Sequence, residues 1–154
     1  MDGKALRAES QPEETLDFGI LPELIGYHVR RAQLYLFADF ARTMADAQIT
    51  PGQFGVLSLV AANPGLTQSA LARAVRIERS TMVAVIDALQ GRGLVERKPS
   101  PVDRRSNALM LTAQGRAILD KVIPLVRAHE RRMARNLSAG DKERLIELLP
   151  RLTD

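Results

Sequence analysis

Cysteine is absent from the 154 residues, and so is tryptophan. Without a thiol, the chain can form no disulfide, no thiolate nucleophile, no cysteine zinc site and no thiol redox switch. The sequence has only two histidines, which disfavours a dedicated metal sensor. It also lacks a phosphate-binding glycine loop and a Ser/His/Asp arrangement. We therefore expect a protein that is not an enzyme and that has no metal site and no cofactor.

Long apolar stretches are missing as well. No run of about 18 apolar residues is available to span a bilayer, and the first residues lack the apolar segment of a secretory signal. We therefore expect a cytoplasmic protein with no membrane partner. Aromatic residues make up only 4% of the chain, whereas alanine, leucine and arginine, which favour helices, are frequent. A chain of this length supports one cored domain, and its composition predicts a mainly α fold.

Charge is unevenly distributed along the chain. Residues 51–111 contain eight Arg or Lys against four Asp or Glu, whereas residues 1–50 contain five against eight. A basic central region is consistent with a polyanionic partner, although many proteins are basic for solubility alone. The order of the predicted elements is needed to decide between these interpretations.

The first half of the chain carries clear helix signals. Residues 1–18 are polar and without periodicity, and they are predicted to form a flexible arm. A long first helix is predicted from residue 22 to about residue 47, with a proline in its first turn. A second helix should run from Pro51 to about residue 63, because Thr50 can cap it and Gln53 completes a capping box.

Two shorter helices and a hairpin follow. The third helix is predicted from Thr67 to about residue 75, and the fourth over residues 79–92, with Gly93 as the left-handed residue that ends it. The helical periodicity then gives way to an extended pattern in residues 94–98 and 108–111, which predicts two strands joined by a long basic tip.

The C-terminal region is again helical. Thr112 can cap a helix over residues 113–136, in which Pro124 should produce a kink. Ser138 and Asp141 have the spacing of a capping box at the start of a last short helix. The predicted fold class is mainly α with a small β-hairpin wing.

The order helix, turn, helix and hairpin predicts a winged helix-turn-helix that binds double-stranded DNA. The apolar side of the fourth helix should face the core, which turns the opposite side toward the major groove. On that side Arg79 can pair with guanine or remain a solvated charge, and the sequence leaves both interpretations open. Val83 and Ala84 can contact thymine methyl groups.

The hairpin tip offers a second contact with DNA. Arg104 and Arg105 on a long loop can enter a minor groove, while Asp103 can pair with an arginine and hold the loop in shape. The predicted DNA-binding residues of the third helix, the following turn, the fourth helix and the wing are Thr67, Gln68, Ser69, Arg76, Arg79, Ser80, Thr81, Val83, Ala84, Arg97, Asp103, Arg104 and Arg105.

Five short runs occur in an order and spacing typical of one family. They are residues 49–57, 66–72, 89–97, 103–105 and 111–115. Together they resemble the MarR family of bacterial regulators, winged-helix dimers that usually repress transcription until a small molecule releases them from DNA. The resemblance implies that Asp103 and Arg105 form the family's wing motif, and that the first, fifth and sixth helices build a homodimer. The chain departs from the family at Val83 and Ala84, where Thr and Arg are frequent, so the operator sequence is not implied.

A dimer would place two recognition helices on half-sites roughly 34 to 36 Å apart. The predicted regions are the arm, a dimerisation helix, the winged helix-turn-helix and the C-terminal dimerisation helices, at residues 1–18, 19–48, 49–111 and 112–154. Leucines near both ends are candidates for the dimer interface or for the intramolecular core, and the sequence does not separate the two: Leu21, Leu24, Leu145, Leu148 and Leu152.

The resemblance also implies a pocket between the dimerisation helices and the DNA-binding lobes, where a small organic effector acts. The candidate ligand-binding residues lie on the first helix: Tyr27, His28, Arg30, Arg31 and Tyr35. They suit an aromatic carboxylate or, through the arginines, the phosphates of a coenzyme A thioester, but an ordinary exposed helix face has the same composition. We therefore expect a ligand-responsive repressor. A nonspecific architectural DNA-binding protein is the alternative.

Overall fold

The computed structural model describes residues 16–100 and 107–153. Contacts divide the chain into two units, Met1–Gln33 and Leu34–Asp154. Of the predicted arm, residues 1–15 lie outside the described residues. No helix in the described ranges is long and apolar enough to cross a membrane.

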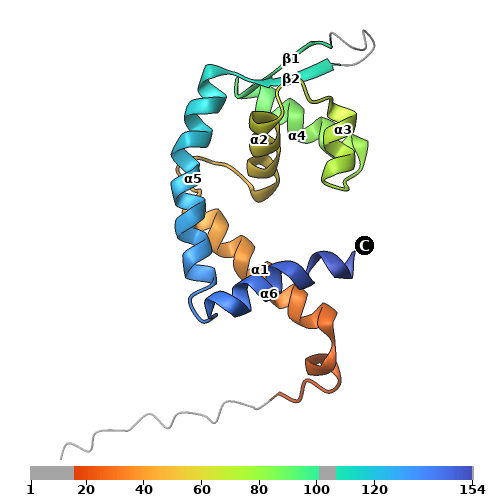
Figure 1. The fold of residues 1–154 in the computed structure, drawn as a ribbon, viewed down its shortest axis with the longest axis vertical. Coiled ribbons are helices and arrows are strands. Elements are labelled where there is room, and N and C mark those ends of the chain that lie inside the picture. Colours follow the sequence, from red (N-terminus) through yellow and green to blue (C-terminus); the bar gives the residue numbers. More distant parts are fainter. Residues whose placement is uncertain (1–15, 101–106, 154) are drawn as a thin grey trace, which may run out of the picture. The chain divides into compact units, whose positions relative to one another are not determined.

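In the first unit a 3₁₀ turn, Leu21–Glu23, precedes the start of α1 (Ile25–Thr43), which continues into the second unit (Figure 1). The prediction placed the start of this helix at Pro22. It begins later because Leu24 has an extended backbone, with φ −98° and ψ 125°, so Pro22 opens the 3₁₀ turn instead. The helix also ends four residues before the predicted position, in a turn closed by the Ala47 amide on the Met44 carbonyl at 3.0 Å.

The start of α2 (Pro51–Ala62) agrees with the prediction. Thr50 Oγ1 accepts a hydrogen bond from the Gln53 amide at 3.2 Å, and Gln53 Oε1 accepts one from the Thr50 amide at 3.1 Å. The reciprocal pair satisfies two amides that have no partner inside a helix, which fixes where α2 begins.

The helix-turn-helix consists of α3 (Gln68–Ala74) and α4 (Arg79–Gly91). Thr67 Oγ1 caps α3 by accepting from the Ala70 amide at 3.2 Å. Arg76 in the turn has φ +53°, a left-handed conformation that redirects the chain into α4. Gly93 has φ +68° and follows the end of α4, as predicted.

The wing consists of β1 (Val95–Pro99) and β2 (Asn107–Leu111), which pair antiparallel with Val95 opposite Leu111. On the other edge of β2, Thr67 forms a single bridge with Ala108. The Leu109 amide also donates to the Leu66 carbonyl at 2.9 Å. The segment before α3 is therefore attached to the wing. The predicted tip residues Asp103, Arg104 and Arg105 lie outside the described residues.

The C-terminal part contains α5 (Ala113–Met133), α6 (Ala139–Leu148) and a 3₁₀ turn, Pro150–Leu152. The helix α5 continues through Pro124 and ends three residues before the predicted Asn136. It ends early because residues 134–137 form a turn, in which the Leu137 amide donates to the Ala134 carbonyl at 2.9 Å. The capping box of Ser138 and Asp141 is present as predicted. Helices and one hairpin confirm the predicted fold class.

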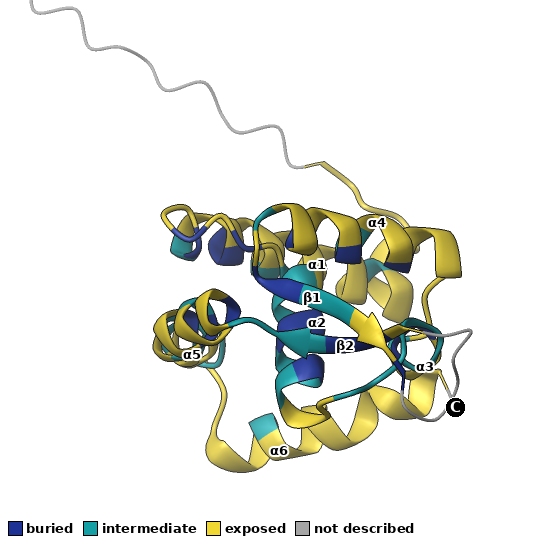
Figure 2. Ribbon diagram, turned by 90° about the horizontal axis from the view of Figure 1, so that it is seen from above, coloured by how far each residue is buried: buried dark blue, intermediate teal, exposed yellow. Residues whose placement is uncertain are grey.

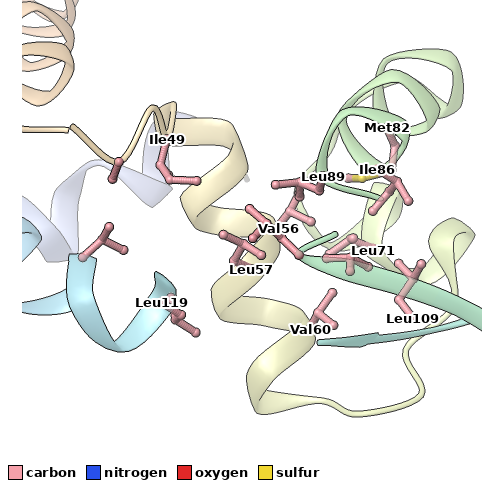
Figure 3. Close-up of a cluster of buried hydrophobic side chains, with 14 of the residues drawn as sticks. Ile49, Val56, Leu57, Val60, Leu71, Met82, Ile86, Leu89, Leu109 and Leu119 are labelled. Carbon is pink, nitrogen blue, oxygen red and sulfur yellow. The ribbon is translucent and has the colours of Figure 1, made fainter. Parts of the chain in front are cut away.

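The core of the second unit surrounds α2, which contacts β2, α4 and α5. Figure 3 shows side chains from these elements and from α3 meeting in one apolar cluster. Its labelled members are Ile49, Val56, Leu57, Val60, Leu71, Met82, Ile86, Leu89, Leu109 and Leu119. Each such side chain contributes about 1.5 to 3 kcal/mol when fully buried. Through this cluster α3, α4 and the base of the wing all pack around α2.

Apolar side chains near both ends of the chain remain outside this core. Figure 2 shows α6 exposed along nearly its whole length. All five leucines that the sequence left ambiguous are exposed in the single chain: Leu21, Leu24, Leu145, Leu148 and Leu152. Leu145, Leu148 and Leu152 are therefore not part of the core of the second unit, and Leu21 and Leu24 are not buried within the first.

Candidate functional site

The outer face of α4 carries the side chains that the sequence predicted to face DNA. Met82, Ile86 and Leu89 are buried, while Val85 is half-buried rather than buried as predicted. The opposite, exposed face (Figure 2) contains Arg79, Ser80, Thr81, Val83, Ala84 and Asp87. The surface is thus partly apolar, with one arginine at its start and one carboxylate farther along.

Arg79 is held in place by the preceding helix. Its Nη2 donates a hydrogen bond to Ser69 Oγ in α3 at 2.8 Å. A guanidinium has five N–H donors, so this bond orients the group and leaves donors for a base or a phosphate. Behind it is a hollow of about 380 Å³ between α3 and α4, which Arg73 and Arg76 also line. Three arginines are therefore grouped at the start of α4.

Arg97 in β1 joins three elements. Its Nη2 donates to Asp87 of α4 at 2.6 Å and to Gln68 Oε1 of α3 at 3.2 Å. Its Nη1 donates to Gln90 Oε1 of α4. The sequence predicted Arg97 and Gln68 as DNA-binding residues, and the structure gives both an internal partner. The network pairs the exposed carboxylate of α4 and fastens the base of the wing to both helices.

A second site lies where α1, α2 and α5 meet within the second unit. A hollow of about 270 Å³ is lined mainly by apolar and aromatic side chains. Its lining residues are Leu36, Phe37, Phe40, Pro51, Phe54, Val126, His129 and Glu130. Such a hollow suits a flat apolar ligand with few polar groups.

A charged cluster lies beside this hollow, in which Asp39 and His129 are buried and the Arg132 side chain is partly exposed. Asp39 Oδ2 accepts hydrogen bonds from His129 Nδ1 and from Arg132 Nη2, both at 2.7 Å. The same Arg132 nitrogen donates to Thr43 Oγ1 at 2.6 Å. The hydrogen bond from Arg132, and then that from His129, holds the pKa of the Asp39 carboxyl far below its ordinary range. The cluster joins α1 to α5.

The predicted ligand-binding residues all lie in α1, and none of them lines this hollow. In the first unit Arg31 Nη1 donates to the Tyr27 hydroxyl at 3.4 Å, Arg30 donates to Gln33 at 3.3 Å, and His28 Nε2 lies 2.8 Å from the Pro22 carbonyl oxygen. Tyr35, in the second unit, is exposed.

Sequence reasoning missed the side chains that do line the hollow. Phe37 and Phe40 are three residues apart on α1, and His129 is a histidine among the apolar positions of α5. The helical spacing of the two phenylalanines was the available signal, but Phe54 and His129 join them only through the tertiary fold. Among the described residues no group of three His, Cys, Asp or Glu is arranged to hold a metal.

Comparison with known proteins identifies the fold and the family. The family model described as MarR family matches residues 47–106. A putative transcriptional regulatory protein for the hcr operon of Thauera aromatica is 40% identical over 129 residues, which cover 83% of this chain and 78% of that protein.

Two structures of the transcriptional repressor CouR are also similar. The one bound to a 23-mer DNA duplex has a TM-score of 0.86 and 45% identity, over 90% of this chain and 99% of that one. The one bound to p-coumaroyl-CoA has a TM-score of 0.82 and 43% identity, over 89% and 96%. With a relative of 40% identity along most of its length and the matching family model, this chain belongs to the MarR family.

Proposed function

We propose that the protein is a homodimeric transcriptional repressor that binds a duplex operator and leaves it when a small aromatic effector binds. The observation that carries this proposal is the exposed face of α4, which Ser69 and the Arg97 network hold beside the wing. A repressor 45% identical to this chain has been solved on a DNA duplex, which supports the same use of this face.

The side chains on α4 suggest how the operator is read. Ser80 and Thr81 are in the first turn, where phosphates and base edges come close in helix-turn-helix complexes. Val83 and Ala84 suit thymine methyl groups, and Arg79 suits guanine or a phosphate. Because Arg97 pairs with Asp87, the carboxylate on this face repels the DNA backbone less.

A second copy of the chain is the proposed cover for the exposed apolar residues of α6. These are Leu145, Ile146 and Leu148, and they are followed by Leu149 at the end of the helix and Leu152 in the next turn. Contiguous apolar surface of this kind is uncommon on a soluble monomer and typical of an interface. The resemblance to the MarR family assigns the terminal helices to the dimer, in agreement with this exposure.

For the effector we propose an aromatic acid or its coenzyme A thioester, with the aromatic group in the hollow between α1, α2 and α5. The hollow is lined by Phe37, Phe40 and Phe54, which favour a planar ring. The similar repressor solved with p-coumaroyl-CoA supports this ligand class. The prediction that Arg30 and Arg31 bind the phosphates of a thioester is kept separate from this hollow, since both residues belong to the first unit.

Arg92 supplies a physical connection from the hollow to α4. It follows the last residue of α4, and it donates to the Gln48 carbonyl at 2.6 Å and to the Ala47 carbonyl at 2.9 Å. These carbonyls belong to the turn between α1 and α2, a few residues before the hollow residue Pro51. A ligand that shifts α2 against α1 would therefore move the end of α4 and change the spacing of the two recognition helices.

The proposal is tested by binding the purified protein to a fragment from its own promoter region. We expect roughly 10³-fold preference over unrelated duplex DNA, and release when p-coumaroyl-CoA or an aromatic acid is added. Equal competition by unrelated DNA would favour the architectural alternative. Specific binding that none of these compounds weakens would refute the effector class and leave operator binding intact.

A further inference from the structure

We propose that His129 determines which aromatic effectors the hollow accepts, because its Nε2 accepts a hydrogen bond from a hydroxyl group on the effector's ring. The inference rests on the proposed function and narrows the effector to a hydroxyaryl compound. It depends on three observations: where the His129 ring lies, which of its nitrogens has a partner, and which other polar groups face the hollow.

The His129 ring is a fixed part of the wall of the hollow. The residue is 5% exposed, and its ring stands edge-on to the Phe40 ring, with centroids 5.5 Å apart and an interplanar angle of 87°. The bond from Nδ1 to Asp39 sets the rotation of the ring. An imidazole held on two sides cannot turn to exchange its nitrogens, so the position of Nε2 is fixed as well.

The second nitrogen, Nε2, is not closed off from accessible space. Among the described residues, every side-chain nitrogen or oxygen that is closed off from solvent has a hydrogen-bond partner. The hydrogen bond of His129 involves Nδ1 and not Nε2. Nε2 therefore borders accessible space, and His129 is one of the residues that line the hollow.

The partner of Nδ1 decides the hydrogen-bonding character of Nε2. Arg132 and His129 hold the pKa of the Asp39 carboxyl far below its ordinary range, so the group is ionised and offers only acceptors. The hydrogen between Asp39 and His129 therefore belongs to Nδ1. In a neutral imidazole with its hydrogen on Nδ1, Nε2 carries a lone pair and accepts.

The other polar group at the hollow is also an acceptor. Glu130 lines the hollow, and its carboxylate lies 3.8 Å from Lys142 Nζ. Two acceptors select a neutral hydroxyl donor over a carboxylate at this end of the ligand. Apolar cavities of about 150 Å³ accommodate benzene, so the hollow of about 270 Å³ has room for a ring with substituents.

The test compares p-coumaroyl-CoA with cinnamoyl-CoA, which lacks only the ring hydroxyl, by calorimetric binding to the full chain. We expect the wild type to bind p-coumaroyl-CoA about tenfold more tightly, because cinnamoyl-CoA leaves Nε2 without a partner. His129→Asn retains a donor for Asp39 but removes Nε2, and it should reduce the ratio of the two affinities to near one. His129→Gln places an amide close to Nε2 and should keep part of the preference.

Two further variants distinguish a loss of hydroxyl recognition from a general loss of structure or ligand binding. Asp39→Asn no longer forces the hydrogen onto Nδ1, so Nε2 is no longer a fixed acceptor and the ratio of the two affinities should fall. Asp120→Asn, at an exposed position of the same helix, should keep the wild-type ratio. Circular dichroism checks the fold of each variant. If His129→Asn does not fold, the role of His129 is judged from two other results. These are the ratio of the two thioester affinities in the wild type and the same ratio in His129→Gln.

Equal binding of both thioesters by the wild type, or an unchanged ratio in folded His129→Asn, would overturn the role of His129 and leave the proposed effector class standing. If neither thioester binds the wild type while the operator still binds, the effector class is wrong, and the hydroxyaryl assignment is wrong with it.

Discussion

Arg97 is the residue on which the wing and the two helices of the DNA-binding lobe converge. Its side chain is 21% exposed and donates to Asp87, Gln68 and Gln90. The sequence predicted that Arg97 contacts DNA, and these bonds lead us to propose that it positions the wing instead. We expect Arg97→Met to lower operator affinity about tenfold and to destabilise the protein by about 1 kcal/mol, since partly exposed bonds contribute little.

The salt dependence of binding distinguishes positioning from contact. If Arg97 does not neutralise a phosphate, the slope of log affinity against log salt stays the same in Arg97→Met. A slope smaller by about one unit would identify a phosphate contact instead. Lys98→Met is the matched control, because Lys98 is the next residue of β1, is exposed and pairs with Glu96 within that strand.

Asp39 should make stability depend on acidity. Arg132 and His129 lower the pKa of its carboxyl in the folded protein, so folding favours the ionised form. The resulting stabilisation is fully present above the pKa of the unfolded chain, about 4, and is lost as pH falls toward the folded value. Urea unfolding between pH 6 and pH 3 should therefore show a larger acid loss for the wild type than for Asp39→Asn. Parallel curves would contradict this role, and Asp120→Asn should follow the wild type.

At the scale of elements, local signals in the sequence were sufficient for the boundaries of α2, α3 and α4. Thr50, Thr67 and Gly93 act within a few residues of their partners, so spacing along the chain reveals them. The pair Asp39 and His129 is separated by 90 positions. No local pattern encodes such a contact, which exists only once α1 and α5 pack together. This is why the helix-turn-helix could be predicted and the wall of the hollow could not.

The junction between the wing and α5 depends on a glycine. A Cβ at Gly115 would lie 1.9 Å from the Leu94 carbonyl oxygen, which accepts a hydrogen bond from the Thr112 amide at 3.2 Å. We expect Gly115→Ala to destabilise the protein by at least about 2 kcal/mol, because backbone must move to relieve the overlap. Chemical denaturation measures this change.

Gly52, in the first turn of α2, is the matched control for Gly115. Nothing lies within 4 Å of a Cβ built there. Gly52→Ala should leave stability unchanged or raise it by about 0.4 to 1 kcal/mol, because alanine restricts the unfolded chain. Equal effects at the two glycines would mean that the Leu94 contact does not constrain the junction.

At the scale of the whole molecule, a substitution that prevents dimerisation should also lower the affinity for the operator. Ile146 in α6 is 59% exposed in the single chain, so Ile146→Glu should spare the core and disrupt a dimer that covers this helix. Sedimentation equilibrium should then report a monomer. Affinity for a two-half-site operator should fall by about 10² to 10⁴, because linked binding of the second half-site is lost.

The exposed polar residue Glu143 provides the control on the same helix. Glu143→Gln should keep both the mass of the dimer and the affinity for the operator. A duplex with a single half-site should bind the Ile146→Glu variant and the wild-type protein with similar affinity. A dimeric Ile146→Glu would place the interface elsewhere. A monomeric variant with full operator affinity would separate the dimer from DNA recognition, and would mean that one α4 and one wing suffice for binding.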